Sequence, residues 1–487
     1  MEQFVNGINS ILWSTPVIYI LLGVGLLFTI LTRLLQVRHL KEMTRLMFER
    51  KSSEAGVSPF QALNIAVGGR VGTGNIAGVA TAIAFGGPGA VFWMWVISFI
   101  GSASAFVEST LAQIYKDKRD GQYRGGPAYY IEKGIGWKWF AILFAIAAII
   151  ALAILLPGIQ SNTTASTVEN AFGLSPTATG IIYVVLLGVV IFGGVKRIAS
   201  TSQVIVPIMA IGYILMSIII LAMNISELPK VVALIFKSAF ALDSTFGGII
   251  GAAISWGVKR GIYSNEAGMG TGAHHAAAAE VSHPVKQGLV QSFSVYIDTL
   301  VCTATAFMIL FTGMYNTQAP DGSFIVNNLG DIEAGPLYAQ EAIDSMFPGF
   351  GAAFLAISLL FFTFTSVVAF FYIAETNLAF LIRGKNFKWA VHILKLVIMI
   401  STYYGAVKTA GMVWAVGDVG MGLIIWINII AIVLLAKPAL IALKDYETQK
   451  RQGIEPVFNP KALGIKNAHY WEERYEKEHV APHKKTV

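Results

Sequence analysis

The sequence predicts an all-α membrane protein with 11 transmembrane helices. Helices 2–6 and 7–11 are expected to form a 5+5 inverted repeat after one extra helix. Three observations support this: long apolar runs, an uneven distribution of basic residues between them, and glycine-rich breaks in two corresponding helices. Of the 487 residues, 55% are hydrophobic and 13% are charged. Soluble proteins carry roughly 25% charged residues, so most of this chain is expected to lie in a bilayer.

Each predicted helix is an apolar run long enough to cross a hydrocarbon core that is about 30 Å thick. The runs lie at 15–36, 59–85, 88–115, 139–157, 176–195, 201–223, 246–272, 287–315, 349–382, 389–407 and 410–436. The first run follows Glu2 rather than a basic region and has no small-residue cleavage site. We therefore expect a retained helix rather than a signal peptide. No strands are expected.

The basic residues alternate between the two sides of this predicted membrane. Segments on one side hold 27 of the 35 Lys and Arg residues, whereas the opposite segments hold only Lys230, Lys237 and Lys408. Because Lys and Arg accumulate in cytoplasmic loops, we predict a multi-pass protein of the cell membrane with its N-terminus outside and its C-terminus in the cytoplasm. This topology accounts for the net charge of +7, and nucleic acid is not an expected partner.

Glycine interrupts helix 2 within 67–78 and helix 7 within 255–270. Helix interiors avoid glycine, and unwound backbone is tolerated in a membrane only where it lines a cavity or is buried in protein. Breaks at corresponding places in two inverted halves are typical of the substrate site of a secondary transporter.

The first break, 72–77, also fits the dinucleotide pattern G-x-G-x-x-G/A, but that pattern requires a preceding strand. Close packing through small residues is a second alternative. We interpret the segment as a hinge whose free N–H groups bind a carboxylate and whose free carbonyls bind a cation.

Two other classes of function are less consistent with the sequence. A channel needs a continuous pore, commonly built by a symmetric oligomer, and the paired breaks argue against one. An intramembrane enzyme is not expected either, since neither H-E-x-x-H nor G-x-S-x-G occurs in the chain.

Residues 69–80, 86–90 and 260–270 resemble the alanine/glycine:cation symporter family, and the similarity extends over nearly the whole chain. The resemblance implies a LeuT-type fold and sodium-coupled import of small neutral amino acids by alternating access. Alanine and glycine are the implied substrates, and Na⁺ is the implied co-transported ion. Glutamine or serine as main substrate, or proton coupling, stay open. The absence of an obvious carboxylate at the first hinge favours sodium.

The resemblance divides the chain into three parts. Residues 1–58 form the extra N-terminal helix and a basic cytoplasmic loop, 59–436 form the transport core, and 437–487 form a cytoplasmic tail. The tail is expected to be a helix or disordered, and it could lie on the inner leaflet.

The resemblance also assigns the substrate site. The N–H groups of the first break, Gly72, Thr73, Gly74 and Asn75, are expected to meet the substrate carboxylate. The Asn75 amide could instead bind the cation or the freed backbone. Gln160, near the outer end of helix 4, is expected to contact substrate, with an interhelical hydrogen bond as the alternative.

The sodium site is implied by the same alignment. It takes the carbonyls of about Gly68 and Val71 together with hydroxyls of helix 9, where Thr363, Thr365 and Ser366 are candidates. Oxygen ligands suit a hard cation. The alternative is that these hydroxyls bond back to carbonyls of their own helix, and which two bind is undecided.

At the second break, Trp256 is expected to form a pocket wall flanked by Ser255 and Gly257, with core packing as the alternative. Intramembrane charges are usually functional, but their partners are not readable from sequence. They are Arg70, Glu108, Lys259, Arg260, Glu266, Asp298, Glu375 and Asp418. A histidine cluster, His274, His275 and His283, is expected in a solvated inner loop rather than in a metal site.

Overall fold

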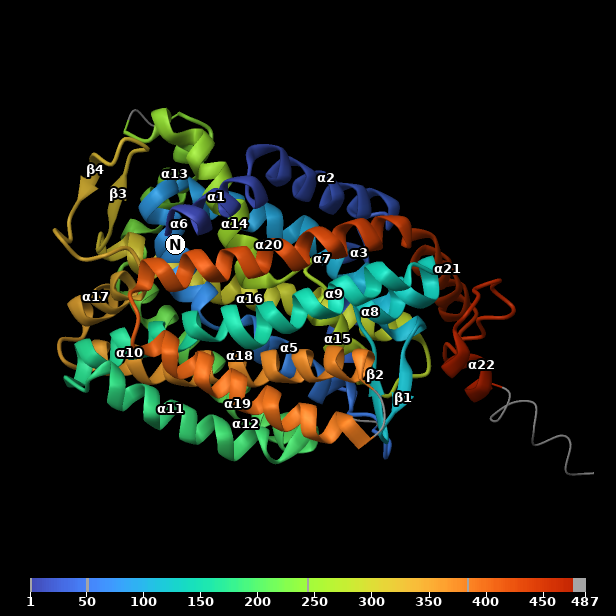
Figure 1. Cartoon of the computed structure of the whole chain (residues 1–487). Helices are drawn as coiled ribbons and strands as arrows, with labels where there is room; N and C mark the ends of the chain where they lie inside the picture. Colours follow the sequence, from blue (N-terminus) through green and yellow to red (C-terminus); the bar gives the residue numbers. More distant parts are fainter. Residues whose placement is uncertain (1, 50–51, 243–244, 383–384, 476–487) are drawn as a thin grey trace, which may run out of the picture.

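The computed structural model describes residues 2–49, 52–242, 245–382 and 385–475, and its helices run side by side along one long axis (Figure 1). The last residues of the predicted tail, 476–487, lie outside the described part. The long apolar helices are α2 (Thr15–Leu31), α7 (Gly89–Ile114), α11 (Pro176–Ile191), α12 (Gly194–Met223), α16 (Pro284–Thr312), α18 (Phe350–Leu381), α19 (Lys385–Ala406) and α20 (Ala410–Leu434). Predicted helix 4 consists of α9 (Lys138–Ile150), the π-helical segment η3 (Ala151–Leu155) and α10 (Pro157–Phe172).

Among the described residues, 8 helices are long and apolar enough to cross a membrane. The other three predicted spans are also helical, but one of them, α11, has only 16 residues and the remaining two are broken. Each predicted span therefore contains a helix, and 8 of these helices are long and apolar enough to cross a membrane.

The first broken helix consists of α5 (Pro59–Arg70), a bend at 71–73, the π-helical segment η1 (Gly74–Gly78) and α6 (Val79–Gly86). Its start is defined by a capping box, in which Ser58 and Gln61 each bond the other's backbone N–H. The bend begins at Val71, whose ψ of 98° leaves the helical region.

The second broken helix consists of α14 (Ile250–Asn265) and α15 (Thr271–Ala277). Between them Gly268 and Gly270 have φ of 84° and 82°, a left-handed conformation that glycine adopts without steric cost. Glu266 also has a left-handed φ, of 55°. Both predicted breaks are thus confirmed.

Shorter elements cover the two ends of the helical body. They are α1 (Glu2–Leu12), α3 (Leu35–Arg38), α4 (Leu40–Met47), α8 (Pro127–Tyr130), η2 (Ile131–Ile135), η4 (Ile225–Glu227), α13 (Leu228–Ala239), η5 (Gly247–Ile249), α17 (Pro336–Met346), α21 (Ala436–Arg451) and α22 (His469–Tyr475). Figure 1 places α13, α17, β3 and β4 at one end and β1, β2, α21 and α22 at the other. The elements at each end are the ones that the distribution of basic residues predicts to lie on the same side of the membrane.

The expectation that strands are absent was wrong. Two antiparallel hairpins lie outside the helical body, β1 (Asp117–Arg119) with β2 (Gln122–Arg124) and β3 (Asn316–Gln318) with β4 (Phe324–Asn327). The first hairpin turns at Asp120 and Gly121, with φ of 50° and 75°. Asp-Gly suits such a turn, since both central residues need positive φ.

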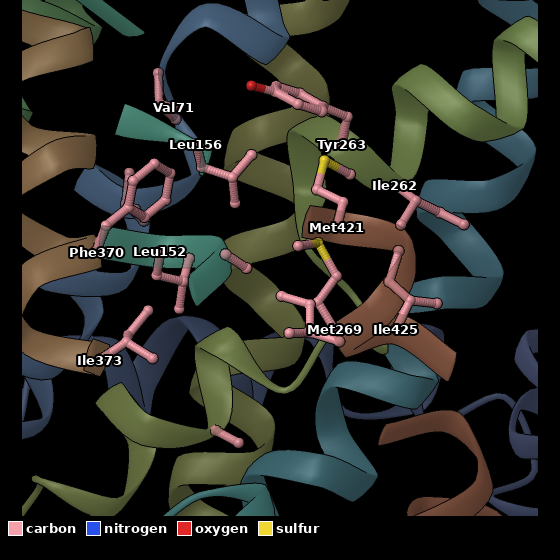
Figure 2. Close-up of a cluster of buried hydrophobic side chains, with 14 of the residues drawn as sticks. Val71, Leu152, Leu156, Ile262, Tyr263, Met269, Phe370, Ile373, Met421 and Ile425 are labelled. Carbon is pink, nitrogen blue, oxygen red and sulfur yellow. The ribbon is translucent and has the colours of Figure 1, made fainter. Parts of the chain in front are cut away.

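A cluster of buried apolar side chains fills the space between the helices around the first break (Figure 2). It includes Val71 at the bend, Leu152 and Leu156 of helix 4, and Phe370 and Ile373 one to two turns beyond the helix 9 hydroxyls. Apolar side chains thus pack against the bend on this side.

The described part of the tail packs against the helical body. The Trp471 indole is 2% exposed and donates to the carbonyl of Gln113 at 2.7 Å. Arg474 pairs with Glu280 at 2.6 Å, and the Phe458 N–H donates to the Ser282 carbonyl. Of the two predicted alternatives, the structure bears out the helical one with α21 and α22, and the aromatic side chains of the tail pack on a buried surface of the body.

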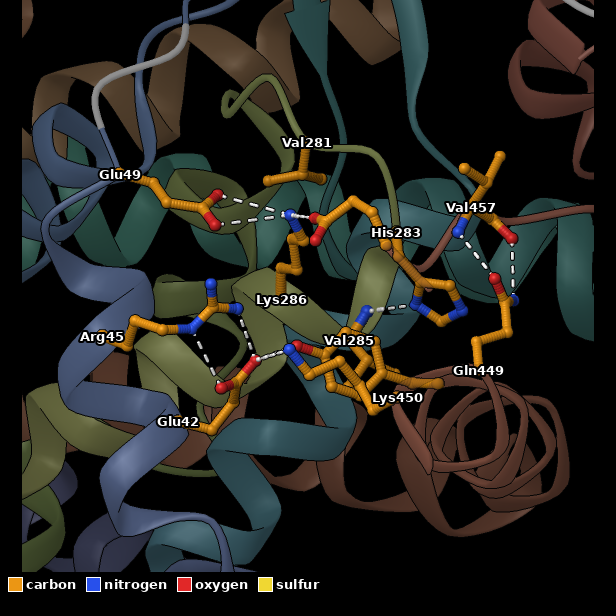
Figure 3. Close-up of polar contacts among 12 residues, drawn as sticks. Glu42, Arg45, Glu49, Val281, His283, Val285, Lys286, Gln449, Lys450 and Val457 are labelled. Carbon is orange, nitrogen blue, oxygen red and sulfur yellow. Dashed lines mark hydrogen bonds and ion pairs between the residues drawn. The ribbon is translucent and has the colours of Figure 1, made fainter. Parts of the chain in front are cut away.

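The expectation of a solvated histidine cluster was also wrong. His274, His275 and His283 are 0%, 1% and 0% exposed. His283 caps α16 by accepting from the Val285 N–H (Figure 3), and its other nitrogen lies 3.1 Å from Asp445 of the tail. The charge and spacing of these histidines do not show which segments cover them. Their burial therefore could not be predicted from the sequence.

Ionic contacts tie α4 to the tail at the same end (Figure 3). Glu42 binds Arg45 at 2.7 Å and Lys450 at 3.3 Å, and the Tyr446 hydroxyl donates to it at 2.6 Å. Burial raises the pKa of Glu42, but the bonds from Arg45 and Tyr446 outweigh this and lower it to about 2. The contact is therefore complete at neutral pH and is lost only as pH falls below the ordinary carboxyl range.

Trp471→Ala should release the tail from the body. Loss of a buried aromatic ring costs about 3–5 kcal/mol, so residues 454–475 should exchange amide hydrogens much faster, as measured by mass spectrometry in detergent. Trp389→Ala is the control, because Trp389 is 72% exposed. Equal exchange in the two variants would show that Trp471 does not hold the tail.

Candidate functional site

The bend of the first broken helix frees backbone N–H groups that a continuous helix would satisfy. The N–H of Gly72 donates to the Asn75 side-chain oxygen at 2.9 Å. The N–H and the hydroxyl of Thr73 both donate to Gln160 Oε1, at 3.1 Å and 2.9 Å. Two side-chain oxygens therefore occupy the positions at which the hinge offers its donors.

Gln160 lies on α10, is 3% exposed, and reaches the bend from the facing helix. Its carbonyl oxygen accepts two hydrogen bonds, as an oxygen of a carboxylate would. A Cβ atom on Gly72 would lie 2.9 Å from this oxygen, so glycine is needed for the close approach. The structure brings the predicted residues Gly72, Thr73, Asn75 and Gln160 together.

Oxygen atoms gather on the other side of the same bend. The Ser366 hydroxyl on α18 donates to the Gly68 carbonyl at 3.1 Å and to the Phe362 carbonyl at 3.1 Å. The Thr365 hydroxyl reaches the Phe362 carbonyl at 3.0 Å, and its Cβ would lie 3.2 Å from a Cβ on Gly68. These carbonyls and hydroxyls are hard oxygen ligands.

The third candidate hydroxyl points elsewhere. Thr363 Oγ1 lies 2.6 Å from Thr164 Oγ1 on α10. Val71 is the residue that follows α5 at the bend, and it is fully buried. Its carbonyl is therefore outside the regular helix, next to this cluster of oxygen atoms. Among the described residues no group of three or more His, Cys, Asp or Glu could hold a metal ion. The neutral oxygen set suits an alkali cation rather than a transition metal.

The last turn of α14, in the second broken helix, packs against the first broken helix at Gly74. A Cβ on Gly74 would lie 2.9 Å from both the Ser264 Cα and the Tyr263 ring. Ser264 and Asn75 converge on one carboxylate, Asp298 of α16. The sequence identified Asp298 as an intramembrane charge, but the expectation that the hinge lacks a carboxylate was wrong, because α16 brings this one from far along the chain.

Trp256 lies on α14, farther from the first bend than Ser264. It precedes Ser264 by eight residues, or about 12 Å along a helix. It lines a cavity of about 510 Å³ with Phe85 and Trp414, and its ring stacks on Phe85 at 4.7 Å. This cavity opens at the end of α14 that the topology predicts to be outside.

The neighbours of Trp256 do not face the hinge residues named above. Gly257 faces α7, since a Cβ there would lie 2.6 Å from that of Trp93. Ser255 is half-buried. The structure therefore places 255–257 beside the cavity and against α7 rather than in contact with the first bend.

Most of the other intramembrane charges are paired. Asp418 on α20 binds Lys259 at 2.6 Å and Arg260 at 3.0 Å, beside the cavity. Glu375 binds Arg124 at 3.0 Å. These pairs join helices that are remote in sequence, which is why no partner was predicted.

Two carboxylates hold the second break. Glu108 on α7 accepts from the Gly270 N–H at 3.0 Å and from Asn428 at 2.9 Å. Glu266 accepts from the Thr271 hydroxyl at 2.8 Å. Glu266 therefore bonds across the second break, to the first residue of α15.

The sequence model of one protein family, described as the sodium:alanine symporter family, matches residues 1–460. This chain belongs to the sodium:alanine symporter family. A putative sodium/proton-dependent alanine carrier protein, YrbD of Bacillus subtilis (strain 168), is 72% identical over 479 residues, covering 98% of this chain and 99% of the relative. The sodium/proton-dependent alanine carrier protein of Bacillus sp. (strain PS3) is 54% identical over 437 residues, covering 89% and 98%.

A third member of the family, the probable sodium/glutamine symporter GlnT of Bacillus subtilis (strain 168), is 45% identical over 461 residues, covering 94% of this chain and 93% of the relative. The solved structure of MhsT in complex with L-phenylalanine has a TM-score of 0.60 at 14% identity and covers 81% of this chain and 93% of its own. That likeness confirms a LeuT-type fold. The protein is therefore a multi-pass membrane symporter and not an enzyme.

Gly72→Ala should weaken amino-acid binding in the purified protein, because the added Cβ would occupy the space of Gln160 Oε1 and the Ser366 hydroxyl. Overpacking costs about 1–3 kcal/mol, which corresponds to roughly a 5- to 150-fold loss of affinity in an equilibrium binding assay. Gly78→Ala is the matched control, since its Cβ would meet nothing closer than 3.9 Å. Normal binding by Gly72→Ala would place the ligand elsewhere.

Proposed function

We propose that this protein imports alanine together with sodium by alternating access, using the bend of the first broken helix as the shared site. One observation supports this most directly: the same few residues offer N–H donors to Gln160 and carbonyl oxygen to Ser366. An unwound segment of this kind suits an anion on one side and a cation on the other. Alanine carries the carboxylate and Na⁺ is the cation.

The proposed sodium ligands are the carbonyls of Gly68 and Val71 and the hydroxyls of Thr365 and Ser366. The bonds that Ser366 now makes to two carbonyls would be replaced by ion contacts, since a hydroxyl oxygen has lone pairs to offer. Thr363 is the weaker candidate, because its hydroxyl is engaged with Thr164. Na⁺ is here a co-transported substrate.

The proposed alanine site takes the carboxylate at the N–H groups of 72–75. Gln160 Oε1 marks one carboxylate oxygen, and the side chain would turn aside to bind substrate. A Cβ added to Gly72 would clash with the Ser366 hydroxyl, and one added to Gly74 would lie 2.9 Å from Ser264 Cα. There is thus little free space at the bend, which favours a small amino acid. Direct contact of Ser255, Trp256 and Gly257 with alanine stays a prediction, and their position favours a role on the access path.

The proposed architecture has eleven spans, with helices 2–6 and 7–11 as inverted halves of a 59–436 core. Residues 1–58 and 437–487 are the added helix with its loop and the cytoplasmic tail. The N-terminus is proposed to be outside, as the 27 basic residues on the opposite side favour.

Glutamine is the second candidate substrate, because a relative that is 45% identical is named a probable sodium/glutamine symporter. Counter-flow in proteoliposomes with alanine, glycine, serine and glutamine, with and without sodium, ranks the candidates. A preference for glutamine would contradict the small site proposed at Gly72 and Gly74. Serine transport equal to that of alanine would mean that a hydroxyl is tolerated.

Ser366→Ala should raise the sodium concentration needed for half-maximal alanine uptake about tenfold or more, since a polar contact to a charge contributes about 1.5–3 kcal/mol. Thr363→Ala should change it far less. Alanine should in turn raise sodium affinity by the same factor by which sodium raises that of alanine. Uptake that is unchanged when choline replaces sodium would refute sodium coupling.

A further inference from the structure

A basic cavity lies at the predicted inner end of the extra helix α2, outside the proposed transport core. It has a volume of about 250 Å³, whereas roughly 15 Å³ is enough for one water molecule. The turn after α2 forms one wall and α21 forms the other, and Figure 1 shows α3 and α21 at this end of the molecule. Leu440, Lys444, Glu447 and Arg451 line the cavity from α21. Their spacing of four, three and four residues places them on one helix face.

The cavity carries more positive than negative charge. Its basic lining residues are Arg33, Arg38, Lys444 and Arg451, and the carboxylate among its lining residues is Glu447. Arg38 already binds this carboxylate at 3.0 Å. Within the described residues, Arg33, Lys444 and Arg451 have no carboxylate within ion-pair distance. Three positive charges therefore line one cavity without a counter-ion from this part of the chain.

The turn that brings Arg33 to the cavity is strained. Arg33 and Leu34 both have a φ of 56°, in the left-handed region that residues other than glycine rarely adopt. Arg38 holds the turn, because its Nε donates to the Arg33 carbonyl at 2.6 Å and its Nη2 to the Thr32 carbonyl at 3.0 Å. Such strain persists only where the surroundings fix it, and it is frequent at ligand sites.

Apolar side chains continue from the cavity onto the outer surface of α2. Leu31 lines the cavity and is itself exposed, as are Ile30 before it and Leu34 after it. On α20, which contacts α2, the last residue, Leu434, is also exposed. Exposed apolar side chains on a membrane-spanning helix face hydrocarbon. The cavity therefore lies where the hydrocarbon core ends and the lipid headgroups begin.

The charge of the cavity matches the lipids of that side. The basic residues predict this end of the molecule to be cytoplasmic, and the cytoplasmic leaflet carries anionic lipids whose headgroups bind in basic pockets between helices. A guanidinium group presents two parallel N–H donors to phosphate, and a lysine adds a point charge. Free phosphate shares this chemistry but has no acyl chain to lie against Leu31.

We propose that the cavity binds the phosphate of an anionic phospholipid from the inner leaflet. Arg33, Lys444 and Arg451 neutralise the headgroup, and an acyl chain lies along Ile30 and Leu31 of α2. A zwitterionic lipid brings a cation of its own to a site that is already basic, so the cavity selects lipids with a net negative charge. This assignment holds whichever amino acid the protein transports.

The bound lipid would join two parts of the chain that lie outside the proposed core. Beside the cavity, Glu42 of α4 binds Lys450 of α21 at 3.3 Å. Arg33 on one element and Lys444 and Arg451 on the other carry like charges around the same cavity, and like charges repel. An anionic headgroup between them removes this repulsion and stabilises the contact of α21 with the end of α2.

The test is a lipid titration of the purified full-length protein in detergent, with bound lipid counted by native mass spectrometry. Phosphatidylglycerol is the anionic probe, phosphatidylcholine is the zwitterionic one, and inorganic phosphate is the free anion. Phosphatidylglycerol should bind at least about tenfold more tightly than phosphatidylcholine, and added salt should weaken its binding. An equal concentration of inorganic phosphate should not displace it.

The combined variant Arg33→Gln, Lys444→Gln and Arg451→Gln removes the three unpaired charges. Each cation near the membrane surface contributes about fivefold to affinity, so this variant should lose phosphatidylglycerol affinity on the order of 100-fold. Lys444→Gln alone should lose about fivefold. The single variant decides the matter if the combined one does not fold, since Lys444 is exposed on the surface of α21.

The matched control combines Lys118→Gln, Lys138→Gln and Lys388→Gln. These three lysines are also exposed and lie in segments predicted to be on the same side of the membrane, but they do not line the cavity. The control loses the same charge and should bind phosphatidylglycerol as the wild type does.

Four results would overturn the proposal. They are unchanged affinity in the variant of Arg33, Lys444 and Arg451, an equal loss in the control, equal binding of the two lipids, and displacement by an equal concentration of inorganic phosphate. The last result would assign the cavity to a free anion. None of these measurements depends on sodium or alanine, so the lipid site and the proposed function stand or fall separately.

Discussion

The structure depends on the backbone groups that are freed where the first broken helix bends. In a membrane interior, an unpaired N–H or carbonyl costs several kcal/mol. Gln160, Asn75 and Ser366 supply the partners, each from a different part of the fold. The helices around the bend are positioned so that these side chains reach it, and the glycines allow the approach.

In the proposed function, that constraint links the cation and the amino acid without contact between their two sites. The donors at Gly72 and Thr73 and the Gly68 carbonyl belong to one short stretch of chain. A ligand on either side fixes the conformation of the same bend, so the second ligand finds its groups already oriented. Asp298 extends this link to the second broken helix, because it bonds to Asn75 and Ser264 at once.

The two ends of the molecule are closed to different degrees. At one end a cavity opens beside Trp256. At the other end the docked tail packs on the helices through Trp471. Access from a single side is what alternating access requires. The contacts of Trp471 and Arg474 must then loosen, or move with the helices, when the opposite side opens.

The sequence by itself determined the helices, their order and both breaks, because apolar runs and glycines act locally through length and backbone freedom. It also identified the residues of the first bend. Only the tertiary structure decided which residues meet there: that Gln160 bonds to Thr73, that Thr363 turns to Thr164, and that Asp298 bridges both breaks. Burial of the tail and of His274 was likewise decided in three dimensions. These contacts join segments far apart in the chain, and side-chain pairing across helices leaves no periodic trace in the sequence.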